Sequence, residues 1–261
     1  MVVEYYMIRG IGAFFYTLEF LIAMGVFLLV FYLYLRRINR KMIFVFLIGG
    51  LINTGVELLL QGLGIRIIAE AYFFTLPIDF PYICFILGFY EGGVKTVIGY
   101  CMVIYLLYRK RLFKRLLLFL VLSIFITFFV YSASTAYYLI IEPESVLFTA
   151  RNMTGILPNL LLLIAFGVSL LSFLLNKKIT KKRKYTIFFY MLGQIAYLLA
   201  FTIPLHIFML RYIGFDSGST YTPANIFAQI IFMYGYFLLF EGIGVNIIAY
   251  PIIYQLKLVE F

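Results

Sequence analysis

Charged side chains are scarce in this sequence, which excludes a water-soluble globular protein. Only 12% of the 261 residues are charged, 65% are hydrophobic, and the mean hydropathy is +1.06. An ordinary soluble domain carries about 25% charged residues and needs them to cover its surface. We therefore expect an integral, multi-pass membrane protein, with the cell membrane as its location.

Cysteine, histidine and tryptophan are also rare, with two, one and no copies respectively. Cys84 and Cys101 lie 17 residues apart in one hydrophobic run, on the order of 25 Å along a helix, which excludes a disulfide between them. The sequence has no glycine-rich nucleotide loop and no Cys/His metal spacing. We therefore expect no cofactor and no bound metal ion.

Long apolar runs are what the sequence does contain. Each is long enough to cross about 30 Å of hydrocarbon as a helix. The runs cover residues 11–35, 42–65, 82–107, 116–139, 155–175, 185–210 and 225–255. They predict an all-α bundle of seven transmembrane helices, a single transmembrane domain over residues 1–261. Residues 65–81 leave a re-entrant or interfacial segment open.

The distribution of the 21 cations predicts the orientation. Sixteen of them follow the first, third, fifth and seventh runs: Arg36, Arg37, Arg40, Lys41, Arg109, Lys110, Arg111, Lys114, Arg115, Lys177, Lys178, Lys181, Lys182, Arg183, Lys184 and Lys257. Loops rich in Lys and Arg stay in the cytosol, so we expect the N-terminus outside and the C-terminus in the cytosol. The net charge of +10 is thus explained by topology and membrane lipids, and we expect no nucleic-acid partner. The oligomeric state stays open.

Two glycine-containing patterns concern how the helices are arranged. Gly88 and Gly92 are four residues apart, which favours close packing of the third span against a neighbour. Glu91-Gly92 precedes Tyr100 by the same spacing with which Glu241-Gly242 precedes Tyr250. A repeat of spans 1–3 in spans 5–7, a 3+1+3 plan, is one interpretation; shared membrane composition is the other.

Four glutamates lie inside the predicted spans, where ionisable groups are costly and commonly functional. Glu19, Glu57, Glu91 and Glu241 each lie 16 to 18 residues from a cation at the cytosolic end of their span. At 1.5 Å per residue this distance is roughly 24–27 Å for all four. We therefore predict one layer of carboxylates, open to the outer half of the membrane as a pocket.

Further polar residues share this depth. Lys95 follows Glu91 by four residues, the spacing of an ion pair on one helix face. The other residues that we expect to line the pocket are Asn53, Gln61, Arg66 and His206. His206 is alternatively a hydrogen-bonded interfacial residue. The carboxylates require protonation or a cationic partner, and a hard cation held by glutamates alone is a further alternative.

The half of the spans nearer the cytosol contains few polar residues other than tyrosines, and Gln194 and Asn246 stand as isolated exceptions. A path for a hydrophilic solute needs polar lining, so this plug favours an enzyme or a ligand-binding site. Aromatic residues make up 20% of the chain. Their ring faces suit an apolar substrate that passes through cationic intermediates.

The second span carries Asn53 and, four residues on, Glu57, and acids recur in the third and seventh spans. In this the chain resembles the small seven-helix integral-membrane terpene cyclases of fungal meroterpenoid pathways. It departs from their motif at Val56, where that family has tryptophan. The resemblance implies metal-free cyclisation started by a carboxyl that protonates an epoxide or alkene, with Glu57 matching the motif and Glu241 corresponding by helix.

These patterns predict a membrane-embedded enzyme that uses acid–base chemistry on a lipid or isoprenoid-like substrate. Glu57 is the expected general acid, Glu241 its base or charge-stabilising partner, and Glu91 a third catalytic group positioned by Lys95, with Glu19 completing the wall. A proton- or cation-coupled transporter of small solutes is an alternative that uses the same carboxylates. A ligand-sensing or assembly subunit is the third.

Overall fold

The computed structural model describes residues 4–12, 14–63, 71–142, 146–152, 156–216, 221–242 and 246–259, and is mostly helical, at 74%. Four helices are long and apolar enough to cross a membrane. They are α1 (Phe15–Leu35), α2 (Met42–Gly62), α5 (Arg111–Ile141) and α8 (Thr186–Ile207). Their length and composition agree with the expected membrane protein.

The remaining helices are shorter or interrupted. They are α3 (Tyr82–Leu87), the π-helix η1 (Gly88–Val94), α4 (Lys95–Tyr108), α6 (Ile156–Leu174), α7 (Lys181–Lys184), α9 (Ile226–Ala228), the π-helix η3 (Gln229–Gly242), the 3-10 helix η4 (Asn246–Ile248) and α10 (Ala249–Gln255). Helical segments thus fall in each of the seven predicted ranges. The seventh range is divided among four of them, however, and the number of membrane crossings stays a prediction.

A four-stranded antiparallel sheet departs from the all-α expectation. Its strand order is β4 (Val146–Asn152), β1 (Tyr5–Gly12), β5 (Arg211–Asp216) and β6 (Tyr221–Pro223), and a separate hairpin joins β2 (Tyr72–Phe73) to β3 (Leu76–Pro77). The first predicted span was therefore too long at its start, because residues 11 and 12 belong to β1. β-branched and aromatic residues, which favour strands, are frequent in these segments.

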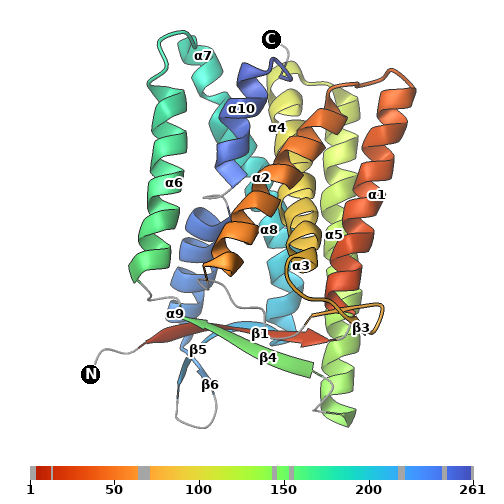
Figure 1. The fold of residues 1–261 in the computed structure, drawn as a ribbon, viewed down its shortest axis with the longest axis vertical. Helices are drawn as coiled ribbons and strands as arrows, with labels where there is room; N and C mark the ends of the chain where they lie inside the picture. Colours follow the sequence, from red (N-terminus) through yellow and green to blue (C-terminus); the bar gives the residue numbers. More distant parts are fainter. Residues whose placement is uncertain are drawn as a thin grey trace.

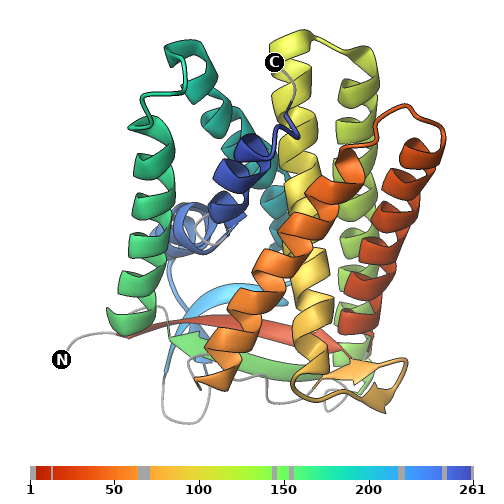
Figure 2. The same cartoon turned by 45° about the horizontal axis from the view of Figure 1, so that its top comes forward.

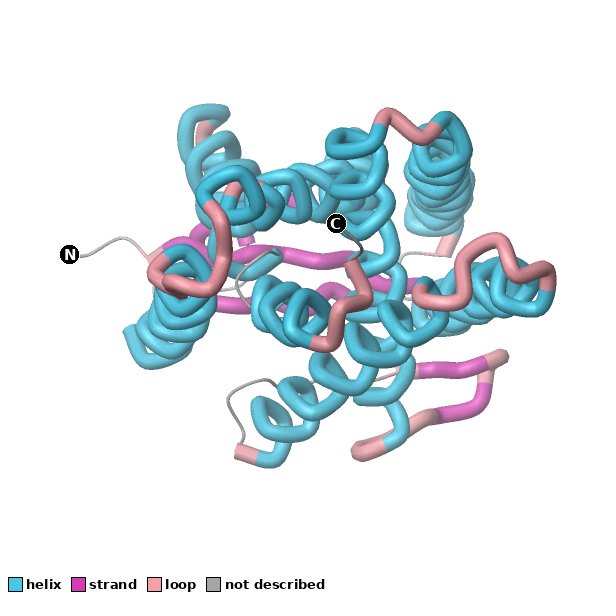
Figure 3. Tube along the Cα trace, turned by 90° about the horizontal axis from the view of Figure 1, so that it is seen from above, coloured by secondary structure: helices cyan, strands magenta, loops and turns pink. Residues whose placement is uncertain are grey.

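The sheet and the basic loops lie at opposite ends of the bundle (Figures 1 and 2). The sheet caps the end at which the N-terminus lies, and its strands cross beneath the helices when the bundle is viewed along its length (Figure 3). The loops around residues 36–41, 109–110 and 175–180 lie at the other end together with the C-terminus. We call this second end the basic end.

Glycines bring three helices into close contact, as the packing interpretation of Gly88 and Gly92 predicted. A Cβ atom at Gly88 would lie 2.7 Å from Thr54 Cα on α2, and one at Gly92 would overlap Gly49 O. A second close crossing joins α4 and α8, where a Cβ atom at Gly193 would lie 2.7 Å from Gly99 Cα. The backbones of these helices therefore approach more closely than larger residues would allow.

Candidate functional site

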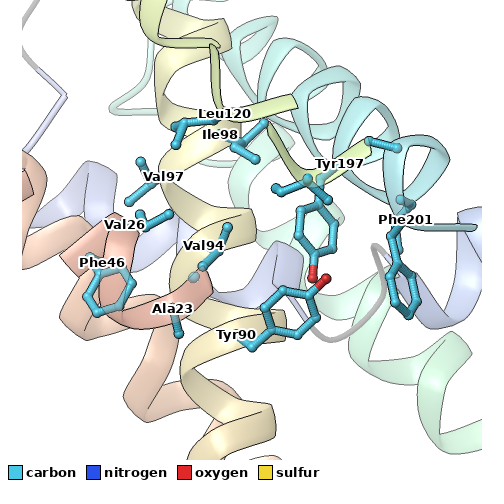
Figure 4. Packing of buried hydrophobic residues seen from close by; sticks show 14 of the residues in the cluster. Ala23, Val26, Phe46, Tyr90, Val94, Val97, Ile98, Leu120, Tyr197 and Phe201 are labelled. Atoms are coloured by element: carbon cyan, nitrogen blue, oxygen red, sulfur yellow. The ribbon is translucent and has the colours of Figure 1, made fainter. Parts of the chain in front are cut away.

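Two tyrosines form the centre of the candidate site. Tyr90 comes from η1 and Tyr197 from α8, and only 0% and 1% of their surfaces are exposed. Their ring centroids are 5.7 Å apart, and their hydroxyl groups point toward each other (Figure 4). Phe128 and Phe201 lie 6.1 and 6.2 Å from the Tyr90 ring. The hydroxyl pair is therefore enclosed by aromatic rings.

Charged side chains from four elements surround this pair. The carboxylates of Glu19 and Glu91 and the guanidinium of Arg9 all act electrostatically on the Tyr90 hydroxyl. The Lys95 ammonium lies 5.4 Å from the centre of the Tyr197 ring, within the range of a cation–π contact. We call Arg9, Glu19, Glu91 and Lys95 the charged cluster.

Arg9, the arginine of the charged cluster, belongs to the sheet, and a second arginine, Arg211, lies beside it on the neighbouring strand. Arg9 on β1 is directly opposite Arg211 on β5 in the antiparallel register. Their guanidinium carbons lie 5.9 and 5.2 Å from the centre of the Phe201 ring. Two neighbouring cations repel each other, so the carboxylate of Glu19, which is fully buried, offsets a cost that the strand register imposes.

Methionine and phenylalanine support the two arginines. The Arg211 Nε and Nη2 atoms lie 3.4 and 3.2 Å from the sulfur of Met7, and Arg9 lies 4.8 Å from the centre of the Phe15 ring. Arg211 is 4% exposed. A planar guanidinium can stack on aromatic rings and donate hydrogen bonds in its plane at the same time.

Glu57, the expected general acid, lies on α2 and is 3% exposed. The Gln61 amide donates a hydrogen bond to it at 3.2 Å. Asn53, one turn earlier, packs against Gly92, the residue after Glu91. Glu57 therefore lies about 6 Å closer to the sheet than the level of Glu91, a modest departure from a single layer.

Three further predicted residues have different outcomes. His206 Nδ1 lies 3.0 Å from the carbonyl oxygen of Arg211, and its ring makes an edge contact with Tyr234 at 5.7 Å, so its described role is the hydrogen-bonded one. Arg66 lies outside the described residues. Glu241 belongs to the last turn of η3, and its side chain is outside the described part of the chain.

The described carboxylates do not converge on one point. Among the described residues, no group of three or more His, Cys, Asp or Glu is close enough to hold a metal ion. A cation site made by several glutamates, one of the alternatives above, has no support in this part of the chain. The described geometry brings Glu19 and Glu91 to the tyrosine pair, whereas Glu57 is bonded to Gln61.

The apolar plug toward the basic end stays a prediction, but buried polar groups meet at the interface of α4 and α8. The hydroxyl of Tyr190 donates to the backbone carbonyl oxygen of Asn246 at 3.3 Å and lies one helical turn from Gln194. Tyr190 also lies 3.1 Å from Thr96 Oγ1. These polar side chains are dispersed in the sequence and meet only across the helix crossing.

Sequence reasoning missed four residues of the site: Arg9, Arg211, Tyr90 and Tyr197. Arg9 and Arg211 lie near the ends of predicted spans, where a cation usually reflects the orientation of the protein in the membrane. Single tyrosines are common in membrane helices and do not stand out. One signal was available, since Tyr90 directly precedes Glu91 in the only span with both an acid and a lysine.

Two cavities in the described part of the chain have no glutamate in their lining. One is a small space of about 50 Å³ near Phe173 and Tyr254. The other is an open, apolar groove of about 530 Å³ lined by Ile230, Ile231, Tyr234, Gly235 and Tyr236. The predicted carboxylate pocket is therefore not among these two cavities.

Comparisons with protein-family models, with curated proteins and with solved structures find no match to this chain. The function is therefore inferred from the contacts around Tyr90, Tyr197 and the charged cluster.

Proposed function

We propose that the protein is a membrane-embedded enzyme that acts by acid–base chemistry on a lipid or isoprenoid-like substrate at the charged cluster. The observation that carries the proposal is the position of the fully buried Glu19 and the partly buried Glu91 near the Tyr90–Tyr197 pair, inside a shell of aromatic rings. A carboxyl in an apolar site is suited to donate a proton. The ring faces around it stabilise the positive charge that such protonation creates.

The proposed roles follow from the contacts. Glu91 is the general acid nearest in sequence to Tyr90, and the tyrosine pair passes its proton onward. The positive charges of Arg9 and Lys95 stabilise the carboxylate that forms when a glutamate of the cluster loses its proton. Glu57 and Glu241 remain sequence-based candidates for the acid and its partner, as the resemblance to membrane terpene cyclases implies. The π-helical backbone around Glu91 supports a functional role, because π-helices are frequent at functional sites.

The open groove on η3 supports access for an apolar substrate. Its volume of about 530 Å³ is in the range of small-molecule sites. Tyr234 in its wall contacts His206 at 5.7 Å and lies within the electrostatic range of Arg211. A hydrocarbon chain in the groove would thus have its polar end near the buried Arg211.

We further propose seven membrane crossings, with the sheet outside and the basic end in the cytosol. The opposite placement of sheet and basic loops (Figure 1) supports this orientation. The 3+1+3 repeat gains support from one parallel, since both Glu-Gly pairs lie in π-helices, η1 and η3.

The test is to incubate the full chain in lipid nanodiscs with total membrane lipid extracts and isoprenoid alcohols, and to follow their masses. We expect the wild-type protein to convert at least one component and Glu91→Gln to lose at least 100-fold of that rate. Asp79→Asn, which changes an exposed acid outside the charged cluster, serves as the matched control and should retain activity. Conversion that is unchanged in Glu91→Gln would contradict the proposed acid.

A proton-coupled transporter is the second candidate, favoured by the polar contacts of Tyr190 at the α4–α8 interface. Those contacts extend the polar region toward the basic end. Liposomes with a pH-sensitive dye inside would separate the two functions. Solute-dependent proton flux without lipid conversion would favour the transporter and exclude the enzyme.

A further inference from the structure

A line of buried polar side chains runs from the charged cluster along the interface of α4 and α8. On α8 it consists of Tyr197, Gln194 and Tyr190, which are three and four residues apart and share one face of the helix. On α4 it consists of Thr96 and Tyr100, again four residues apart. At most 3% of any of these side chains is exposed. We call these five residues the polar seam.

The two helices meet in the middle of the seam, where the Tyr190 hydroxyl lies 3.1 Å from Thr96 Oγ1. At its far end the Tyr100 hydroxyl lies 3.3 Å from Asn39 Nδ2 and donates to the carbonyl oxygen of Leu258 at 3.4 Å. Asn39 and Leu258 both belong to the basic end. The seam therefore links that end to the charged cluster.

The other steps of the seam lie along single helices, between residues three or four apart. Such residues are neighbours on one helix face, separated by about 4.5–6 Å along its axis, so their polar groups are within reach of one bridging water molecule. Both amide atoms of Gln194 and the hydroxyl of Tyr197 are buried without a hydrogen-bond partner in the described part of the chain. Buried polar groups of this kind are satisfied by ordered water, and one molecule bridges such a gap.

We propose that the polar seam holds a chain of water molecules and carries protons between the basic end and the charged cluster. The proposal rests on the acid–base function proposed above, because it supplies the protons that Glu91 and Glu19 exchange. In each step an oxygen accepts a proton on a lone pair and releases its own proton to the next oxygen. Nothing is oxidised or reduced, and hydroxyls and water both donate and accept as this requires.

The seam suits protons better than larger cations. None of its five residues is charged, so a metal ion would lose its hydration without a compensating carboxylate. The rings of Tyr190 and Tyr250 lie 4.8 Å apart beside its middle, and both are fully buried. This packing closes the seam to larger solutes.

The experiment is hydrogen–deuterium exchange of the protonated carboxyl groups, followed by infrared spectroscopy after the full chain in nanodiscs is transferred into D₂O. The carboxyl band is assigned with Glu19→Gln and Glu91→Gln. We expect Tyr190→Phe and Gln194→Leu each to slow the exchange at least tenfold. Tyr185→Phe is the matched control, because Tyr185 is 51% exposed and outside the seam, and it should exchange at the wild-type rate.

Equal rates in all variants would overturn the proposal, as would a wild-type spectrum without a carboxyl band that Glu91→Gln removes. Radiolytic hydroxyl-radical labelling supplies a second readout, since it marks side chains next to bound water. Tyr190 should be labelled more than Phe128, which is equally buried at 0% exposure; equal labelling would exclude the water chain.

Lipid conversion measured on the same samples separates the two proposals. If exchange slows in Tyr190→Phe but no lipid is converted by the wild-type protein, the seam stands and the enzyme proposal falls. If lipid is converted and the exchange rates are equal, the enzyme proposal stands and the seam falls.

Discussion

The charged cluster and the polar seam are neighbouring regions of one buried interior, yet they are built differently. The cluster lies near the sheet and combines two carboxylates and two cations with aromatic rings. The seam lies toward the basic end and contains only hydroxyl and amide groups. Burying charges costs more free energy than burying hydroxyl groups. The charged cluster therefore holds the reactive acids, whereas the uncharged seam is suited to carry protons to them. This difference should be measurable in how each region responds to substitution.

The largest effect is expected in the cluster. Glu19→Gln removes a negative charge from a fully buried position in the charged cluster, which also holds the buried cation of Lys95. Leaving a buried cation with less compensation should lower the free energy of unfolding by about 3 kcal/mol, measured by thermal or denaturant unfolding in detergent. Asp79→Asn, on an exposed residue, is the control. Equal stability of the two variants would mean that Glu19 is neutral in the folded protein.

The next effect concerns the helix crossing on which the seam depends. Gly193→Leu would force α8 away from α4, because even a Cβ atom there would lie 2.7 Å from Gly99 Cα. We expect a loss of about 1–3 kcal/mol of stability from this overpacking. Gly167→Leu on α6 has nothing within 4 Å of the added Cβ atom and should unfold like the wild type. A tolerated leucine at position 193 would show that the crossing is looser than described.

A smaller effect is expected from Tyr190→Phe, which deletes one hydroxyl and keeps the ring. The loss of the 3.1 Å contact with Thr96 should lower the unfolding free energy by about 1 kcal/mol, clearly less than Glu19→Gln. Chemical unfolding of both variants in one detergent makes the comparison. If Tyr190→Phe lowered the unfolding free energy as much as Glu19→Gln does, the hydrogen bonds of the seam would contribute as much to stability as the charges of the cluster.

The smallest effect is expected where the seam ends. The Asn39 side chain accepts from the backbone N–H groups of Lys41 and Met42 at 3.0 and 3.1 Å, so Asn39→Ala weakens the start of α2 by about 0.5–1 kcal/mol. Its effect on carboxyl exchange should nevertheless exceed that of the exposed Tyr185→Phe, since Asn39 contacts Tyr100. An unfolding midpoint and exchange rate at wild-type values would place Asn39 outside the route.

The sequence predicted the helical segments well because hydrophobic length is a local property. It also identified Glu19 and Glu91 as acids within the bundle, since charges inside an apolar run stand out. It could not predict that Arg9 joins them, because that placement depends on pairing with a strand some 200 residues away. It likewise missed the seam, where Thr96 and Tyr190 become neighbours only through the close approach of two glycines. Whether Glu57 and Glu241 act with the cluster stays a prediction.

The position of β1 in the middle of the sheet has a consequence for biosynthesis. β1 is made well before its partners β4 and β5, which begin at Val146 and Arg211. The register that positions Arg9 therefore forms only after the chain has been synthesised as far as β5. The site is completed late, and a truncated chain that ends before Arg211 would carry the glutamates without the strand that fixes their arginine.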